Sequence, residues 1–169
     1  MTKKYQVAFL WAVLFCAAGC STISMQSVKD AGAVHKLNRL YIFVKCGEVK
    51  NLPMMNNLAA GLVNCFSNQP AKVQVTVTSP LDLDPNVYDR QIKEFAPDSV
   101  LILSMTASVV DPYGGYPNMT FDAGLFNPAT KKLEWRASIV NSGSTDVMDR
   151  RMRKMSDSIV NQLKLDGFL

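Results

Sequence analysis

Few residues of this chain have types and neighbours suited to covalent chemistry, and Cys46 is the first of them to consider. It directly precedes Gly47 and Glu48. A thiolate nucleophile needs a neighbouring base or a lowered pKa, and the only cations close to it in the sequence are Lys45 and Lys50. We therefore interpret Cys46 as a structural thiol, with a thiol-dependent enzyme as the alternative.

Other catalytic and metal-binding patterns give no support for an enzyme. The only histidine, His35, precedes the segment in which we expect the folded domain, so no Cys–His or Ser–His pair is predicted there. The sequence has no Gly-rich phosphate loop, zinc-ligand spacing or nucleophile elbow. Met148, Met152 and Met155 have thioethers that suit Cu(I), but their spacing is that of a buried helix face. We predict no enzyme, no cofactor and no metal.

The amino terminus has the features of a secretory signal. Lys3 and Lys4 are followed by an unbroken apolar run, Val7 to Ala18, and then by small residues. A charged start, a short apolar stretch and a small-residue cleavage site define such signals. The run has 12 residues, whereas a membrane span needs about 18 to 20. Residues 1–19 are therefore predicted to be a signal peptide rather than a membrane anchor.

The end of this segment, Ala17-Ala18-Gly19-Cys20, resembles the lipobox of bacterial lipoproteins. In that family the signal is cut before a cysteine that carries diacylglycerol and a further acyl chain such as palmitate. Ala17 stands where Leu is usual. The resemblance implies a lipid anchor on Cys20, and Ser21 is not the Asp that is associated with inner-membrane retention. The implied location is the outer membrane, with the domain facing the periplasm; an ordinary signal peptide with a chance cysteine is the alternative.

Length and charge limit what the mature chain can be. Residues 20–169 are enough for one ordinary domain. Of the 18 basic residues, Lys3 and Lys4 belong to the signal, which leaves 16 against 14 acidic residues. Because a nucleic-acid-binding domain normally shows a strong basic excess, we predict no nucleic-acid partner.

The pattern of apolar residues predicts a single α/β domain over residues 38–169, after a flexible polar tether at 20–37. The expected order is β-α-β-α-β-β-β-α, and right-handed crossovers make the first three strands parallel. We expect a five-stranded mixed sheet in the order 2-1-3-4-5, with helices on both faces. The predicted strands are 40–44, 72–78, 100–110, 119–125 and 133–139, and the helices begin near 51, 84 and 145.

Three side-chain predictions depend on these elements. Trp135 shares an alternating face with Leu133, Ala137 and Ile139, so it should be a core residue. The basic cluster Arg150, Arg151, Arg153 and Lys154 is read by default as a solvated helix face. Cys46 and Cys65 should not form a disulfide, because the helix after the first strand places them about 20 Å apart.

The lipobox, the βαβαβ start and the stretch FDAGLFNPATKKLEWRAS resemble a group of small Gram-negative lipoproteins of unknown function. Their domain is similar to the amino-terminal domain of the translocation protein TolB. The resemblance implies an accessory role in envelope assembly or transport, and it assigns no site residues.

A candidate site follows from the expected topology. Ligands of open α/β sheets favour the crevice where the strand order reverses, here between the first and third strands. The segment DPYGGYP should also present two tyrosines at that end. The candidate contacts are Cys46, Gly47, Glu48, Asp111, Tyr113 and Tyr116. We expect a non-enzymatic lipoprotein that binds an envelope protein; the alternative is a small-ligand-binding domain at this crevice.

Overall fold

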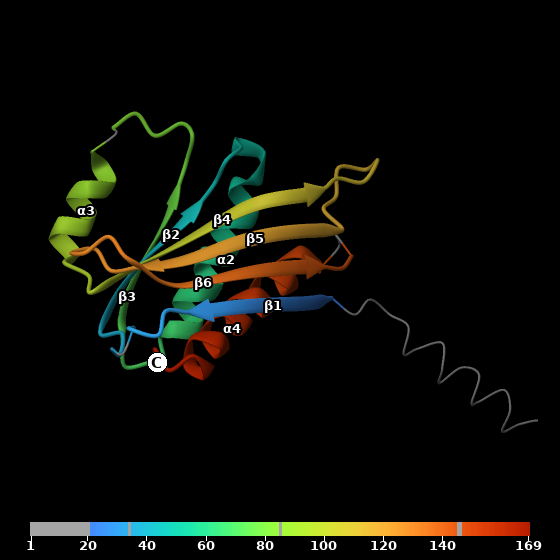
Figure 1. The fold of residues 1–169 in the computed structure, drawn as a ribbon. Helices are drawn as coiled ribbons and strands as arrows, with labels where there is room; N and C mark the ends of the chain where they lie inside the picture. Colours follow the sequence, from blue (N-terminus) through green and yellow to red (C-terminus); the bar gives the residue numbers. More distant parts are fainter. Residues whose placement is uncertain (1–20, 34, 85, 145–146) are drawn as a thin grey trace, which may run out of the picture.

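The computed structural model describes residues 21–33, 35–84, 86–144 and 147–169, so the predicted signal peptide and Cys20 lie outside the described residues. The described part contains one mixed sheet in the order β1-β6-β5-β4-β2-β3 (Figure 1). The strands are β1 (Thr22–Lys29), β2 (Arg39–Lys45), β3 (Lys72–Thr78), β4 (Ser99–Val109), β5 (Asn118–Phe126) and β6 (Leu133–Ser142). The helices are the short η1 (Val49–Asn51), then α2 (Leu52–Phe66), α3 (Val87–Phe95) and α4 (Met148–Leu165).

The parallel part of the sheet follows from β2, whose apolar run is buried on both faces. β2 pairs in parallel with β3 on one side and with β4 on the other. α2 begins at Leu52 with a proline in its first turn, where the missing N–H costs nothing. The helix returns the chain to β3, as the βαβ pattern predicts.

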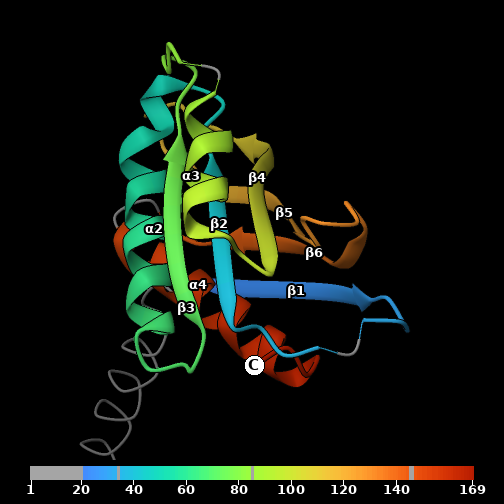
Figure 2. The same ribbon diagram turned by 90° about the vertical axis from the view of Figure 1, so that its left-hand side faces the viewer.

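The two faces of the sheet are covered unequally. α2 and α4 pack side by side on one face over the main core, and α3 lies on the opposite side of β2 and β3 from α2 (Figure 2). α3 contacts a small second cluster formed by Tyr41, Phe43 and Val100. On that second face, no described helix covers β5, β6 or β1. Within the described ranges, no helix is both long and apolar enough to cross a membrane.

The α/β class is confirmed, but the predicted five strands in the order 2-1-3-4-5 are wrong. A sixth strand, β1, comes from the segment 20–37 that we predicted to be a flexible tether, and it pairs antiparallel with β6. β6 is therefore an inner strand rather than the expected edge. Only Ile23 and Met25 of β1 pack against the core, and two inward apolar residues are too few to give a recognisable alternating pattern.

Asp166, just after α4, fixes β1 to the helix layer. Its carboxylate accepts hydrogen bonds from Ser27 Oγ (2.8 Å) and Trp135 Nε1 (2.6 Å), and Lys29 Nζ donates to its main-chain carbonyl (2.8 Å). Burial raises the pKa of Asp166, but the hydrogen bonds from Trp135, Ser27 and Gln162 outweigh it and hold the pKa below its ordinary value. One carboxylate thus links β1, β6 and α4.

Trp135 is a buried core residue, as predicted, but Leu133 does not share its face. The register between β5 and β6 shifts between Leu125 and Phe126, so Leu125 pairs with Trp135 while Phe126 pairs with Leu133. The irregularity turns Leu133 towards the uncovered side of the sheet, where it is 40% exposed.

Arg151 corrects the prediction of a solvated basic cluster, because its side chain is completely buried. Its guanidinium donates to the Asn141 side chain (2.9 Å) and to the carbonyls of Tyr116 (2.7 Å), Gly143 (3.0 Å), Pro117 (3.4 Å) and Asn141 (2.9 Å). Burial lowers the pKa of Arg151 below its ordinary value. Arg151 therefore ties α4 to the β4–β5 loop and to the end of β6.

Candidate functional site

The predicted crevice begins at the end of β2, where Cys46 is buried. Its thiol donates to the Glu48 carbonyl (3.0 Å) and its N–H donates to the Thr78 carbonyl (3.1 Å). The Glu48 carboxylate pairs with Lys50 (2.8 Å) on the surface. Gly47 has open space where a side chain would lie. These contacts give the thiol a structural environment, because its hydrogen-bond acceptor is a main-chain carbonyl rather than the side chain of a base.

Asp111 and Tyr113 lie beyond this crevice, because β4 continues for five residues past its last pair with β2. Asp111 Oδ1 accepts hydrogen bonds from the N–H groups of Tyr113 (2.9 Å) and Gly115 (2.8 Å). Gly114 has a φ of 81°, which glycine adopts at little cost. Asp111 therefore shapes the loop, and Tyr113 at its tip is 97% exposed.

Tyr116 is the one loop residue among the candidates that returns to the β2 end. Its hydroxyl donates to Asn51 Oδ1 (2.8 Å) at the start of α2. Asn51 is the residue before α2, and its side chain makes no capping hydrogen bond to the helix. The structure thus brings Tyr116 near the segment 46–51, while Tyr113 stays exposed at the loop tip, and the six candidate residues do not form one cluster.

His35 lies against the folded domain rather than apart from it. Its Nε2 is 3.2 Å from Ser99 Oγ and 3.5 Å from Glu134 Oε2. In a catalytic triad the serine and the carboxylate contact opposite ring nitrogens, whereas here both contact the same one. Ser99 is also completely buried. This cluster contains the three residue types of a catalytic triad. It lacks the arrangement of a triad around the imidazole ring, and its serine is not accessible to a substrate.

The three methionines of α4 belong to the core or to its margin. Met152 and Met155 are completely buried in the core, and Met148 packs at its margin. These positions agree with the helical spacing, and the Met155 thioether accepts a hydrogen bond from the buried Asn141 side chain (3.8 Å). In the part of the chain that the structure describes, no group of three or more His, Cys, Asp or Glu side chains could hold a metal ion.

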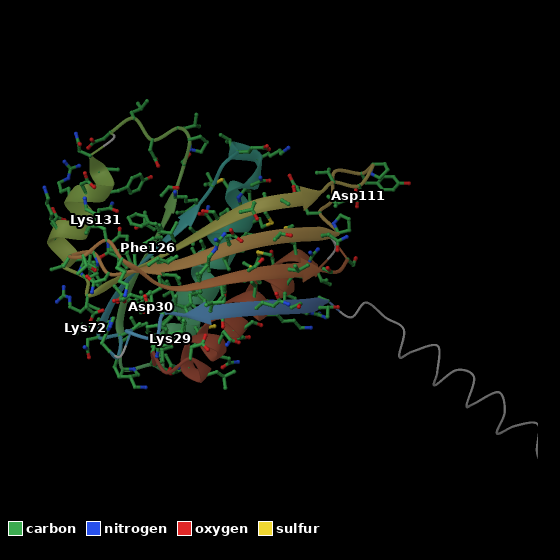
Figure 3. All side chains as sticks on the ribbon, viewed as in Figure 1. Lys29, Asp30, Lys72, Asp111, Phe126 and Lys131 are labelled. Carbon is green, nitrogen blue, oxygen red and sulfur yellow. The ribbon has the colours of Figure 1, made fainter. Side chains whose placement is uncertain are left out.

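A shallow hollow of about 330 Å³ lies on the sheet face that no described helix covers. Its floor includes Ile102, Phe126 and Leu133. A Cβ at Gly124 would lie 2.9 Å from the Phe126 ring and 3.3 Å from Leu133, so the glycine lets both side chains lie across the sheet. Phe126 and Asp111 lie at opposite ends of the β4–β5 hairpin (Figure 3).

Charged side chains surround this apolar floor. Asp122 and Arg136 form an exposed ion pair across β5 and β6 (2.7 Å), and Lys45 lines the other side of the hollow. Sequence analysis missed this site because the register shift that places Leu133 here has no sequence pattern of its own. One residue in the sequence could have indicated the site. Gly124 interrupts an alternating strand, and a glycine in such a position often marks a place where another group approaches the backbone closely.

A second hollow, about 390 Å³, lies between α2 and α4, and most of the residues that line it are polar. Gly61 permits the close helix contact, because a Cβ there would lie 2.5 Å from Ser156 Oγ. Cys65 in its wall donates to Asp157 Oδ1 (3.0 Å). Burial, together with Asp157, raises the pKa of the Cys65 thiol to about 12. This thiol is therefore a poor nucleophile.

Comparisons with known proteins show a fold that this chain shares with solved structures, but they assign it to no family. No family model matches the chain, and no curated protein matches it. Among solved structures, the chain is similar to the PelC dodecamer from Paraburkholderia phytofirmans, with a TM-score of 0.50, 11% identity and coverage of 82% of this chain and 96% of that one. Lipoprotein GNA1162 from Neisseria meningitidis matches with a TM-score of 0.47, 15% identity and coverage of 75% and 98%.

A putative neuraminyllactose-binding hemagglutinin homolog from Helicobacter pylori matches with a TM-score of 0.37, 10% identity and coverage of 77% and 82%. At such identities, the PelC likeness shows a shared α/β fold and nothing about activity. The neighbours include a bacterial lipoprotein. The expected resemblance to TolB receives no support from these comparisons.

Proposed function

We propose that this chain is a lipid-anchored lipoprotein of the outer membrane whose periplasmic domain binds a protein partner of the cell envelope without catalysing a reaction. The observation that carries the binding role is the uncovered sheet face, where the apolar floor of Phe126 and Leu133 is flanked by Lys45, Asp122 and Arg136. An apolar centre with a polar rim is the usual anatomy of a protein interface.

The anchor is supported by the lipobox-like Ala17–Cys20. The non-catalytic role is supported by the surroundings of the possible nucleophiles. Cys46 and Ser99 are buried, and Cys65 is held protonated at neutral pH by burial and by Asp157.

The partner-binding role is tested by site-specific photo-crosslinking in the full-length lipoprotein within cells. A photoreactive side chain replaces Leu133 on the uncovered face, and in the control it replaces Val63 on the outer side of α2. The two native side chains are similarly exposed, at 40% and 51%. We expect one defined protein adduct from position 133, weakened when Arg136→Glu is added, and none from position 63. Equal labelling at both positions would contradict the assignment.

The anchor is tested separately. Intact-mass analysis of membrane-fraction protein should give a product that begins at Cys20 and carries added acyl mass. Cys20→Ala should leave the precursor unprocessed or release soluble protein. Normal membrane retention of Cys20→Ala, with cleavage elsewhere, would overturn the lipid anchor.

A further inference from the structure

The residue that follows Cys20 is fixed on the domain. Lys154 Nζ donates to Ser21 Oγ (3.0 Å), and a Cβ at Gly143 would lie 3.0 Å from Ser21 Cα. Adjacent Cα atoms are about 3.8 Å apart across a trans peptide bond. A lipid on Cys20 would therefore emerge within one residue of the surface formed by Gly143 and Lys154, with no flexible spacer from residue 21 onward.

The β4–β5 loop lies at this same end of the sheet. Thr22 pairs with Ser142 across β1 and β6, and Ser142 pairs with Asn118 across β6 and β5. Gly143 also donates to the Pro117 carbonyl (2.9 Å) at the end of the loop. The loop and the start of β1 lie at the same end of the molecule (Figure 1).

The loop and the last residue of β4 present apolar side chains to solvent. Tyr113 is 97% exposed, Val109 56% and Val110 51%. The loop is also rigidly supported, because Asp111 closes it from within and the buried Arg151 guanidinium binds the carbonyls at its base. An exposed tyrosine on a fixed loop is suited to contact another surface without losing much conformational freedom.

Cations flank the point where the lipid would emerge. Lys154 contacts Ser21, and Arg150 lies one helical turn earlier on the same side of α4, since residues four apart share a helix face. Both side chains are exposed, whereas Arg151 between them is buried. Basic side chains beside a membrane are attracted to anionic lipid headgroups.

We propose that this end of the domain, formed by Ser21, Val109, Val110, Tyr113, Arg150 and Lys154 and called here the anchor end, lies directly against the lipid headgroups. The inference rests on the proposed lipid at Cys20. Tyr113 enters the membrane interface, where the amphipathic tyrosine ring is favoured, and Arg150 and Lys154 approach lipid phosphates. The uncovered sheet face then remains free at the side of the domain for the protein partner.

The test uses the lipidated full-length protein in vesicles of phosphatidylethanolamine and phosphatidylglycerol. Tyr113→Trp is compared with Leu83→Trp, whose native side chain is also 97% exposed but belongs to the loop between β3 and α3, away from the start of β1 (Figure 1). The one native tryptophan in residues 20–169 is Trp135; it is buried, and its emission is subtracted. The readouts are the emission wavelength and quenching by brominated lipids.

We expect the indole introduced at position 113 to shift its emission to shorter wavelength on vesicle binding. Lipids brominated near the headgroup should quench it, while the indole introduced at position 83 keeps its aqueous emission. In the Tyr113→Trp protein, Arg150→Glu together with Lys154→Glu should reduce that quenching.

Two results would overturn this inference, and they differ in what they leave standing. Vesicle-bound, acylated Tyr113→Trp protein whose introduced indole is neither shifted nor quenched would overturn the orientation and leave the lipid anchor intact. Protein without acyl mass would overturn the anchor, and the orientation with it.

Discussion

Arg151 has a role in this molecule that its residue type does not suggest. Arginine is rarely buried without an acidic partner, yet the guanidinium of Arg151 is surrounded by carbonyl and amide oxygens. Among the residues that the structure describes, these oriented dipoles compensate the charge, and no ion pair of Arg151 is found there. The contacts join α4 to the loop that carries Tyr113, so Arg151 positions a proposed functional surface without touching a partner.

Replacing Arg151 with methionine should lower the free energy of unfolding by about 3 kcal/mol or more. Several carbonyls lose their donors together, and an unsatisfied buried polar group costs about 1–3 kcal/mol. Arg150→Met, on the exposed side of the same helix, should change stability by less than about 0.5 kcal/mol. Urea denaturation measures both. Equal effects of the two variants would show that Arg151 is not buried.

Trp135 should be a core residue with an additional hydrogen bond. Trp135→Ala should cost about 3–5 kcal/mol of stability, as for other large buried aromatics. Arg136→Ala removes only an exposed ion pair with Asp122 and should cost less than about 1 kcal/mol. Melting and urea midpoints report the difference. A Trp135→Ala variant of unchanged stability that has lost partner binding would place the tryptophan in an interface instead.

Among the elements, β1 is the least expected, because it extends the sheet with only half of its side chains in contact with the core. Ile23 and Met25 face inward, whereas Ser24 and Gln26 face solvent. Met25→Asp should detach β1 from the sheet, because it would place an unpaired charge at the edge of the hydrophobic core. An aspartate at position 26 should be tolerated.

Hydrogen exchange followed by mass spectrometry separates these two variants. Met25→Asp should accelerate exchange in residues 22–29 and in the facing strand β6, with a loss of about 1–3 kcal/mol in stability. Gln26→Asp should leave the protection of both strands close to that of the unmodified protein. Rapid exchange of residues 22–29 already in the unmodified protein would restore the tether interpretation.

The unit formed by β2 and α2 separates the two cysteines of the domain. Cys46 follows β2, Cys65 lies near the far end of α2, and both are free. Alkylation of denatured, unreduced protein should find two free thiols besides the proposed lipidated cysteine. A Cys46–Cys65 linked peptide would contradict the strand-then-helix arrangement.

In the native protein, alkylation of Cys65 should be slow at neutral pH, because burial and the neighbouring carboxylate raise the pKa of its thiol to about 12. Asp157→Asn should accelerate the reaction, since it removes the negative charge that opposes thiolate formation. Time-resolved labelling measures the rate, and an unchanged rate would mean that Asp157 does not control this thiol.

At the scale of the whole molecule, stability should depend on pH through the carboxylate that joins both layers. The pKa of Asp166 in the folded protein lies below its ordinary value of 3.8. A carboxyl with a lowered folded-state pKa contributes stability above its unfolded pKa and loses it as the pH falls. The contribution of Asp166 should therefore be complete near neutral pH and decline below about pH 4.

Asp166→Asn should be less stable than the unmodified protein near neutral pH, and the difference between the two should shrink below about pH 4. Asp89→Asn, at an exposed position of α3, serves as the control. Urea titrations over a pH series provide the measurement. A stability difference that stays constant with pH would assign the effect to lost packing rather than to the charge.

The sequence by itself determined the elements whose signals are local. The buried run of β2, the proline in the first turn of α2 and the methionine spacing of α4 each specify a structure within a few residues. The α/β class and the separation of the cysteines follow from those elements, and the core position of Trp135 follows from its alternation with Ala137 and Ile139. The lipid on Cys20 is also read from a local motif, and it stays a prediction.

Tertiary structure alone decided the features that depend on distant partners. β1 is a strand because β6 offers an unpaired edge and Asp166, far away in the sequence, binds Ser27. Arg151 is buried because two loops bring their carbonyls to it, and Leu133 reaches the uncovered face because of a register shift. Backbone hydrogen bonds and packing at long sequence separation supply the free energy for each, so no local pattern could have predicted them.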